Sequence, residues 1–224
     1  MEITLSEDSV IEPETIKTAI DLGIPIEVFT YSIPPKTKDF ISLVLKNYLE
    51  ECSLSHLYSK FNFCINELLL NALKANAKRV HFIYKDLDID DPEVYEMGMK
   101  TFRNECIEKR DFYLEKQKKQ GLYVRLSMLL DDSCLNIEVS NNSIPTDFER
   151  KRLVDKVLNC HKFTTEELKG NFVDETEGAG LGINSVCLSL RSLGIAKEDF
   201  QVDIRKKETI MRIRYPLSSG LEAL

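Results

Sequence analysis

The feature that most constrains the fold is a run of glycines at alternate positions, Gly178, Gly180 and Gly182, directly before a helix predicted from 183 to 193. Alternate glycines let the backbone approach a ligand closely, and the free N–H groups at a helix start favour phosphate. The run does not follow a strand of a βαβ unit and has no Gly-Lys-Ser/Thr ending, so it is neither a dinucleotide fingerprint nor a P-loop. Taken alone, such a run is also typical of a flexible loop.

A second feature is a polar stripe on a helix predicted from 57 to 77. Glu67, Asn71, Lys74 and Lys78 are four, three and four residues apart, which places their side chains on one helix face. An amide oxygen is a hard ligand for Mg²⁺, a carboxylate can orient an attacking group, and an ammonium can meet a phosphate. The alternative interpretation is a polar helix face in solvent.

A third feature is a strand, predicted from 135 to 140, that runs into the polar turn Asn141-Asn142-Ser143-Ile144-Pro145. Taken alone, it is an ordinary turn rich in asparagine. The helix predicted to follow it, through Val157, has Thr146 as its N-cap.

The remaining apolar patterns predict helices and strands joined in part by short turns. The predicted helices are 14–22, 38–51 and most of 92–119, and the predicted strands are 26–31, 79–84, 122–130, 200–205 and 209–215. This order favours a two-layer α/β sandwich with a mixed, largely antiparallel sheet covered by helices on one face. We expect a principal domain at 57–217 with a charged helical insertion at 86–120, an N-terminal extension at 1–56 and a tail at 218–224.

Composition narrows the classes of function. A net charge of -7 with scattered basic residues argues against binding to nucleic acid or to an anionic membrane. The six cysteines have no zinc-ligand spacing and are expected to be isolated core thiols in a reducing compartment. No stretch is long and apolar enough to cross a bilayer, and the first residues lack the pattern of a signal peptide, so a cytoplasmic location is predicted.

Taken together and in order, the three features resemble the motifs of the GHKL, or Bergerat-fold, ATPases. This superfamily includes sensor histidine kinases, type II topoisomerases, a chaperone family and mismatch-repair ATPases. The run around Glu67 and Asn71 is similar to the N box, the turn at Asn141 to the first glycine box, and the run from Gly178 to Gly182 to the second glycine box. The resemblance covers about 61–217 and implies an adenine nucleotide and Mg²⁺ as ligands.

The resemblance also implies roles for particular residues. Glu67 is the expected catalytic carboxylate, Asn71 the expected Mg²⁺ ligand, and Lys74 the expected phosphate contact. Asn141 stands where the family reads the adenine amino group, and 161–177 corresponds to a lid. The full set of expected ATP-binding residues is Asn71, Lys74, Asn141, Ser143, Ile144, Gly178, Gly180, Leu181, Gly182 and Thr209.

Two departures from the family pattern narrow the expected activity. Asn141 replaces the usual Asp, which removes a charge-assisted hydrogen bond of roughly 1 kcal/mol, and Ser143 replaces a glycine. No phosphoacceptor helix accompanies the domain, so a kinase of this kind is expected to act in trans on a signalling protein, as in two-component signalling. The strand and helix before the N box are arranged as in anti-sigma-factor serine kinases. The alternative is a nucleotide-gated partner switch with little catalysis, and a homodimer is left open.

The insertion at 86–120 belongs to neither of these family patterns. Its charge favours a solvated helical excursion, and the alternative is an arm that docks a partner.

Overall fold

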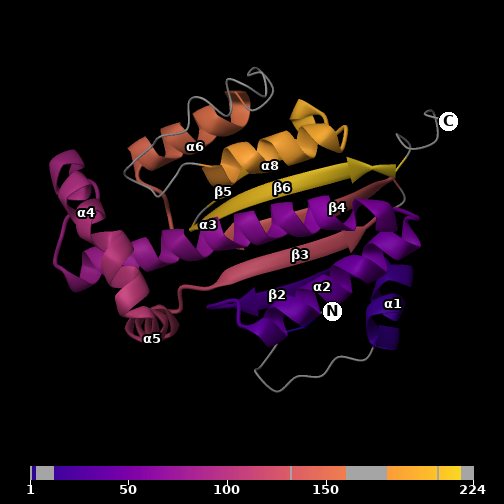
Figure 1. Ribbon diagram of the computed structural model, residues 1–224, viewed down its shortest axis with the longest axis horizontal. Coiled ribbons are helices and arrows are strands. Elements are labelled where there is room, and N and C mark those ends of the chain that lie inside the picture. Colours follow the sequence, from indigo (N-terminus) through magenta and orange to yellow (C-terminus); the bar gives the residue numbers. More distant parts are fainter. Residues whose placement is uncertain (1, 4–12, 132, 160–180, 206, 218–224) are drawn as a thin grey trace.

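A computed structural model describes residues 2–3, 13–131, 133–159, 181–205 and 207–217 of the chain (Figure 1). Within these residues, the strands form one six-stranded sheet in the order β1-β2-β3-β4-β6-β5. Neighbouring strands from β2 to β5 are antiparallel, and β1 joins the edge in parallel. The strands are β1 (Glu2–Ile3), β2 (Ile26–Thr30), β3 (Val124–Leu130), β4 (Cys134–Asn141), β5 (Phe200–Arg205) and β6 (Glu208–Pro216).

The helices of the described residues cover one face of this sheet, with α3 running across the middle strands (Figure 1). They are α1 (Pro13–Asp21), α2 (Pro35–Glu51), α3 (Tyr58–Tyr84), α4 (Pro92–Glu108), α5 (Arg110–Gln120), α6 (Asp147–Asn159) and α8 (Leu181–Ser192). Two short 3-10 turns lie at Ser55–Leu57 and Lys197–Asp199. The protein is therefore an α+β sandwich with a largely antiparallel sheet, as the sequence predicts.

Strand periodicity explains why only one face of the sheet is covered. Alternate residues of β4, such as Leu135, Ile137 and Val139, are buried against the helices. The residues between them face the other way, where Glu138 pairs with Arg212 at 2.5 Å. The helix-covered face therefore carries the main core and any enclosed site.

The predicted N-terminal extension is built into the same core. Strand β2 extends the sheet through its pairing with β3, and Tyr48 of α2 donates a hydrogen bond of 2.7 Å to the carbonyl oxygen of Met128 in β3. Buried residues of α1 and α2, including Ile16 and Leu45, belong to the same apolar cluster as the sheet. The helices predicted at 14–22 and 38–51 and the strand at 26–31 are confirmed.

The strand predicted at 79–84 is wrong, because α3 continues as one helix to Tyr84. The run Val-His-Phe-Ile-Tyr has strand propensity, but packing decides its conformation. Val80 and Phe82 are buried in a second apolar cluster with residues of α4 and α5. His81, which we expected to be structural, is also fully buried there.

The insertion contains two helices, α4 and α5, and the interpretation of it as a solvated excursion is wrong. Its apolar side chains Tyr95, Met99, Phe102 and Tyr113 close over the end of α3. The approach is tight, because a Cβ placed on Gly98 would lie 2.6 Å from Cζ of Phe82. The charged residues of the insertion therefore face outward while its other face completes a second core.

Two further sequence expectations concern the cysteines and membrane insertion. Cys52, Cys64, Cys106 and Cys134 are free thiols. Cys187 is disulfide-bonded, so the expectation of an isolated thiol is wrong there. Among the described residues, every helix is too short or too polar to cross a membrane.

Candidate functional site

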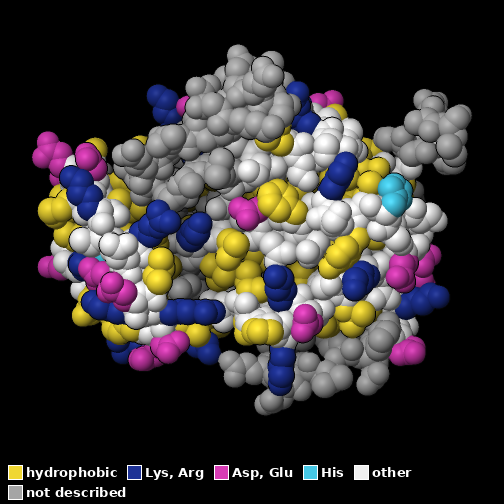
Figure 2. All heavy atoms as spheres, viewed as in Figure 1, with side chains coloured by type: hydrophobic (Ala, Val, Ile, Leu, Met, Phe, Trp, Pro, Cys, Tyr) yellow, Lys and Arg dark blue, Asp and Glu magenta, His cyan; other side chains and the backbone are white. Residues whose placement is uncertain are grey.

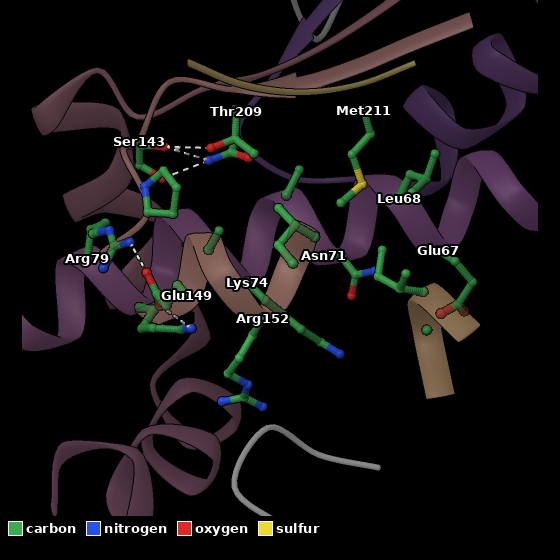
Figure 3. A pocket seen from close by; sticks show the side chains of 18 of the residues that line it. Glu67, Leu68, Asn71, Lys74, Arg79, Ser143, Glu149, Arg152, Thr209 and Met211 are labelled. Carbon is green, nitrogen blue, oxygen red and sulfur yellow. Dashed lines mark hydrogen bonds and ion pairs between the residues drawn. The ribbon is translucent and has the colours of Figure 1, made fainter. Parts of the chain in front are cut away.

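A cavity of about 570 Å³ lies between α3, α4, α6, the end of β4 and the start of α8 (Figure 3). Seven of the residues singled out from the sequence line it: Glu67, Asn71, Lys74, Asn141, Ser143, Gly182 and Thr209. Ile144 does not line it, and its side chain is 47% exposed. Leu181 is the first residue of α8, while Gly178, Gly180 and the expected lid at 161–177 lie outside the described residues.

The polar stripe of α3 faces this cavity over its first three members. Glu67, Asn71 and Lys74 lie along one side of the helix, as their spacing predicts (Figure 3). Lys78 also lines the cavity, but its ammonium donates to Glu149 at 2.7 Å and to the Tyr95 hydroxyl at 2.9 Å. The stripe therefore divides into three groups that face the cavity and one that joins helices together.

The start of α8 lies directly against the stripe. A Cβ placed on Gly182 would lie 3.1 Å from Nδ2 of Asn71 and 3.2 Å from Oε2 of Glu67. Nδ2 of Asn71 is buried and has no hydrogen-bond partner in the part of the chain that the structure describes. The start of α8, Asn71 and Glu67 therefore meet at one wall of the cavity.

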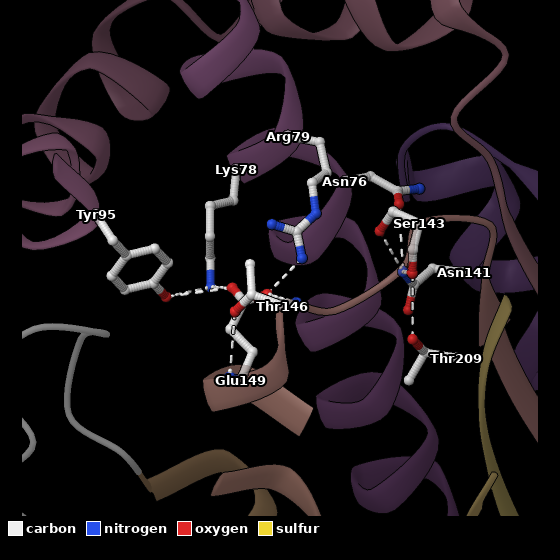
Figure 4. A network of polar contacts seen from close by, with 9 residues as sticks. All are labelled: Asn76, Lys78, Arg79, Tyr95, Asn141, Ser143, Thr146, Glu149 and Thr209. Atoms are coloured by element: carbon white, nitrogen blue, oxygen red, sulfur yellow. Dashed lines mark hydrogen bonds and ion pairs between the residues drawn. The ribbon is translucent and has the colours of Figure 1, made fainter. Parts of the chain in front are cut away.

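The turn after β4 forms a compact polar cluster at the cavity wall (Figure 4). Nδ2 of Asn141 donates to Oγ of Ser143 at 2.7 Å. Thr209 is the register partner of Asn141 on β6, and its hydroxyl donates to the carbonyl oxygen of Ser143 at 3.2 Å. Sheet register therefore brings together the turn that begins at Asn141 and a threonine 68 residues further along the chain.

Helix α6 begins with a capping box that fastens it to α3. The backbone N–H of Glu149 donates to the Thr146 hydroxyl at 3.3 Å, and the backbone N–H of Thr146 donates to the Glu149 carboxylate at 3.0 Å. The predicted Thr146 cap is confirmed. The same carboxylate pairs with Lys78 and with Arg79 (Figure 4). Burial alone raises the pKa of Glu149, but the charges and hydrogen bonds of these two cations lower it to about 2.

The cavity lining carries an excess of positive charge. It includes six cationic side chains (Lys74, Lys78, Arg79, Arg103, Arg152 and Lys156) and two carboxylates (Glu67 and Glu149). Figure 2 shows Lys and Arg side chains gathered on this face between the insertion and the centre of the molecule. The positive charge of this described lining contrasts with the net charge of -7 of the whole chain.

Sequence reasoning missed the contribution of α4 and α6 to the cavity. Met99, Phe102 and Cys106 of α4 form one apolar wall, and Arg152 and Lys156 of α6 lie near its rim. Burial raises the pKa of the Cys106 thiol, against which Lys74 lowers it. The apolar spacing of three and four residues within 99–106 is the signal that identifies this wall.

Comparisons with known proteins give one relevant match. A protein of Treponema pallidum (strain Nichols), described as an uncharacterized protein, is 38% identical over 208 residues. The match covers 92% of this chain and 40% of that protein, so the chain spans about two fifths of its relative's length. No protein-family model and no solved structure matches the chain.

Proposed function

We propose that the chain is an ATP-binding domain of the GHKL class with a Bergerat fold, and that it transfers a phosphoryl group in trans to a signalling protein. The observation that carries the proposal is the close contact of Gly182, at the start of α8, with Asn71 and Glu67. The free N–H groups at a helix start suit a phosphate, and amide and carboxylate oxygens suit Mg²⁺, so this contact fits a magnesium nucleotide.

The residues of the cavity fit a magnesium nucleotide. Among the described residues, no three His, Cys, Asp or Glu side chains gather into a preformed metal site. Mg²⁺ bound with a nucleotide does not need such a cluster, because it usually takes one or two protein oxygens, several waters and the phosphates of the nucleotide. Asn71 supplies the protein oxygen. Its buried amide nitrogen has no hydrogen-bond partner among the described residues that would fix the side chain in another orientation. The bound ion would neutralise charge on the phosphates.

Three further polar groups of the cavity, besides Asn71, have a task in this proposal. Glu67 accepts a hydrogen bond from the attacking group and orients it. Lys74, which is exposed on the cavity side of α3, meets a phosphate oxygen, and Asn141 accepts from the base. The apolar wall of α4 keeps water from the base and excludes larger polar ligands.

Phosphoryl transfer tests the proposal directly. The full chain is incubated with ATP labelled at the γ-phosphate and with candidate partner proteins, and label on the partner is measured. Glu67→Gln is expected to reduce transfer by about 10²- to 10⁴-fold, the usual range for a positioned acid or base. Glu198→Gln changes an exposed carboxylate outside the cavity and serves as the matched control. Transfer that survives Glu67→Gln unchanged would remove the role given to Glu67.

A second candidate function is a nucleotide-gated partner switch with little catalysis. It is favoured by Asn141 and Ser143 in place of the Asp and glycine of the family pattern, and by the order of α1, β2 and α2 before α3. Calorimetry with ADP and ATP, with and without Mg²⁺, separates the two functions. Tight binding without turnover or transfer supports the switch. If millimolar Mg²⁺-ATP leaves the melting temperature unchanged, neither function holds, because mass action stabilises any protein that binds its ligand in the folded state.

A further inference from the structure

Asn76 is a fully buried amide on α3, two residues after Lys74. Its Nδ2 donates to the backbone carbonyl oxygen of Tyr123 at 2.9 Å. A carbonyl oxygen only accepts, so the amide of Asn76 has a single acceptable orientation. Its Oδ1 is thereby turned toward Asn141 and lies 3.4 Å from the amide nitrogen of that residue (Figure 4).

A second acceptor lies against the same atom of Asn141. The backbone carbonyl oxygen of Ser143 is also 3.4 Å from Nδ2 of Asn141. If the Asn141 amide turned over, its oxygen would face two acceptors in a buried place, which costs about 1–3 kcal/mol for each group left unsatisfied. The two acceptors therefore hold the nitrogen on the sheet side and leave Oδ1 as the group available to a ligand. No described residue donates to that oxygen.

The hydroxyl of Ser143 completes the arrangement. It accepts from Nδ2 of Asn141 at 2.7 Å, so its own hydrogen is directed elsewhere. Within the described residues it donates to no protein acceptor, and Ser143 lines the cavity. The cavity wall thus offers an acceptor on Asn141 beside a donor on Ser143.

We propose that Asn76 is a positioning residue that makes this wall selective for a 6-aminopurine over a 6-oxopurine. Adenine carries a donor at N6 beside an acceptor at N1, which matches Oδ1 of Asn141 and the hydroxyl of Ser143. Hypoxanthine and guanine carry an acceptor at position 6, which opposes Oδ1 of Asn141, and a donor at N1, which leaves the hydrogen of the Ser143 hydroxyl without an acceptor. The inference rests on the proposed nucleotide site and adds a cause for its choice of base.

The same contacts explain why Asn stands at 141. A carboxylate there would direct an oxygen at Oδ1 of Asn76 and at the carbonyl oxygen of Ser143, both of which are acceptors. The Asn141 amide instead directs its nitrogen, a donor, at these two oxygens and leaves its own oxygen, an acceptor, for a ligand. The departure from the family pattern is therefore matched by its surroundings, and Asn76, Asn141 and Ser143 act as one unit.

Calorimetry with ADP and inosine diphosphate tests the proposal, because the two bases differ only at position 6 and at N1. The unmodified protein is expected to bind ADP about tenfold to a hundredfold more tightly, the usual discrimination of a matched pair of hydrogen bonds. Asn76→Leu removes the acceptor and frees the Asn141 amide to turn, so the ratio should fall at least fivefold while ADP still binds. Asn76→Asp, protonated in its buried site, keeps an acceptor toward Asn141 and a donor toward Tyr123, so the ratio should be retained.

Each outcome decides something. Equal binding of the two nucleotides, or a ratio unchanged in Asn76→Leu, overturns the role of Asn76 while leaving the nucleotide site intact. Absence of binding by either nucleotide overturns the proposed function and this inference together. If Asn76→Leu does not fold, Ser143→Ala carries the test, because loss of the donor should also lower the ratio, and an unchanged ratio there overturns the proposal.

Discussion

The two halves of α3 use similar polar residues in different ways. Beyond Asn76, several polar side chains join α3 to other helices: Lys78 pairs with Glu149, and the ring nitrogens of His81 contact the Tyr113 hydroxyl and the carbonyl oxygen of Gly98. Only Nε and Nη1 of Arg79 are buried there without a partner among the described residues. In the first half, Asn71 has a buried amide nitrogen without a partner among the described residues. The second half packs against α4 and α5 as a core, and the first half lines the cavity beside the start of α8.

The largest expected effect is at Glu149 of α6, whose carboxylate pairs with Lys78 and Arg79 in the second half of α3. Glu149→Ala leaves Lys78 and Arg79 without their shared carboxylate and removes the capping box of α6, so the free energy of unfolding should fall by about 3–5 kcal/mol. Urea denaturation measures the loss. Glu96→Ala is the control, since Glu96 is exposed and 3.7 Å from Lys100, and it should change stability by less than about 0.5 kcal/mol. A small loss at Glu149 would show that the second half does not depend on this buried network.

The next effect concerns the contact between α4 and α3. Gly98→Ala adds a Cβ 2.6 Å from the ring of Phe82, so one of the helices must shift. Such overpacking should lower the free energy of unfolding by about 1–3 kcal/mol. Chemical denaturation of this variant is compared with that of Met97→Ala, which changes an exposed neighbour on the same helix. Equal stability of the two variants would contradict the tight approach.

A smaller effect, on nucleotide affinity instead of stability, is expected beside the first half of α3. Gly182→Ala places a methyl group 3.1–3.2 Å from Asn71 and Glu67. We expect ADP to bind about tenfold more weakly, equal to about 1.4 kcal/mol, with little change in the melting temperature without nucleotide. Ser185→Ala on the same helix lies outside the cavity lining and is the control. Unchanged ADP affinity in Gly182→Ala would show that the start of α8 does not shape the ligand site.

The smallest effect is a pH dependence at His81. Burial lowers the pKa of His81, against which Glu105 raises it and Lys85 and Lys109 lower it further. The unfolded chain takes up this proton near pH 6.5, before the folded chain does, so stability should decrease as pH falls below about 6.5 toward the lowered pKa. Urea denaturation at about half-unit steps between about pH 7.5 and 5 measures the slope of the free energy of unfolding against pH. A slope retained in His81→Gln would assign the effect to another group.

The sequence predicted the core elements well because local pattern and tertiary packing agree in them. The alternation of β4 and the capping signal at Thr146 both correspond to what the structure contains. The end of α3 was missed because its β-branched and aromatic residues favour a strand locally, and only contact with Tyr95 and Phe102 makes them helical. The apolar spacing within 99–106 marks one face of α4, but the place of that face at the cavity depends on the same long-range contact. Asn76 was overlooked for a related reason, since its role depends on the fold bringing Tyr123 and Asn141 beside it.

The length of α3 has a mechanical consequence. It is a single helix of 27 residues, about 40 Å long at 1.5 Å per residue, with Glu67 in its first half and Phe82 near its end. Glu67 and Phe82 therefore belong to one rigid element, which joins the acid beside Gly182 to the second apolar cluster with α4 and α5.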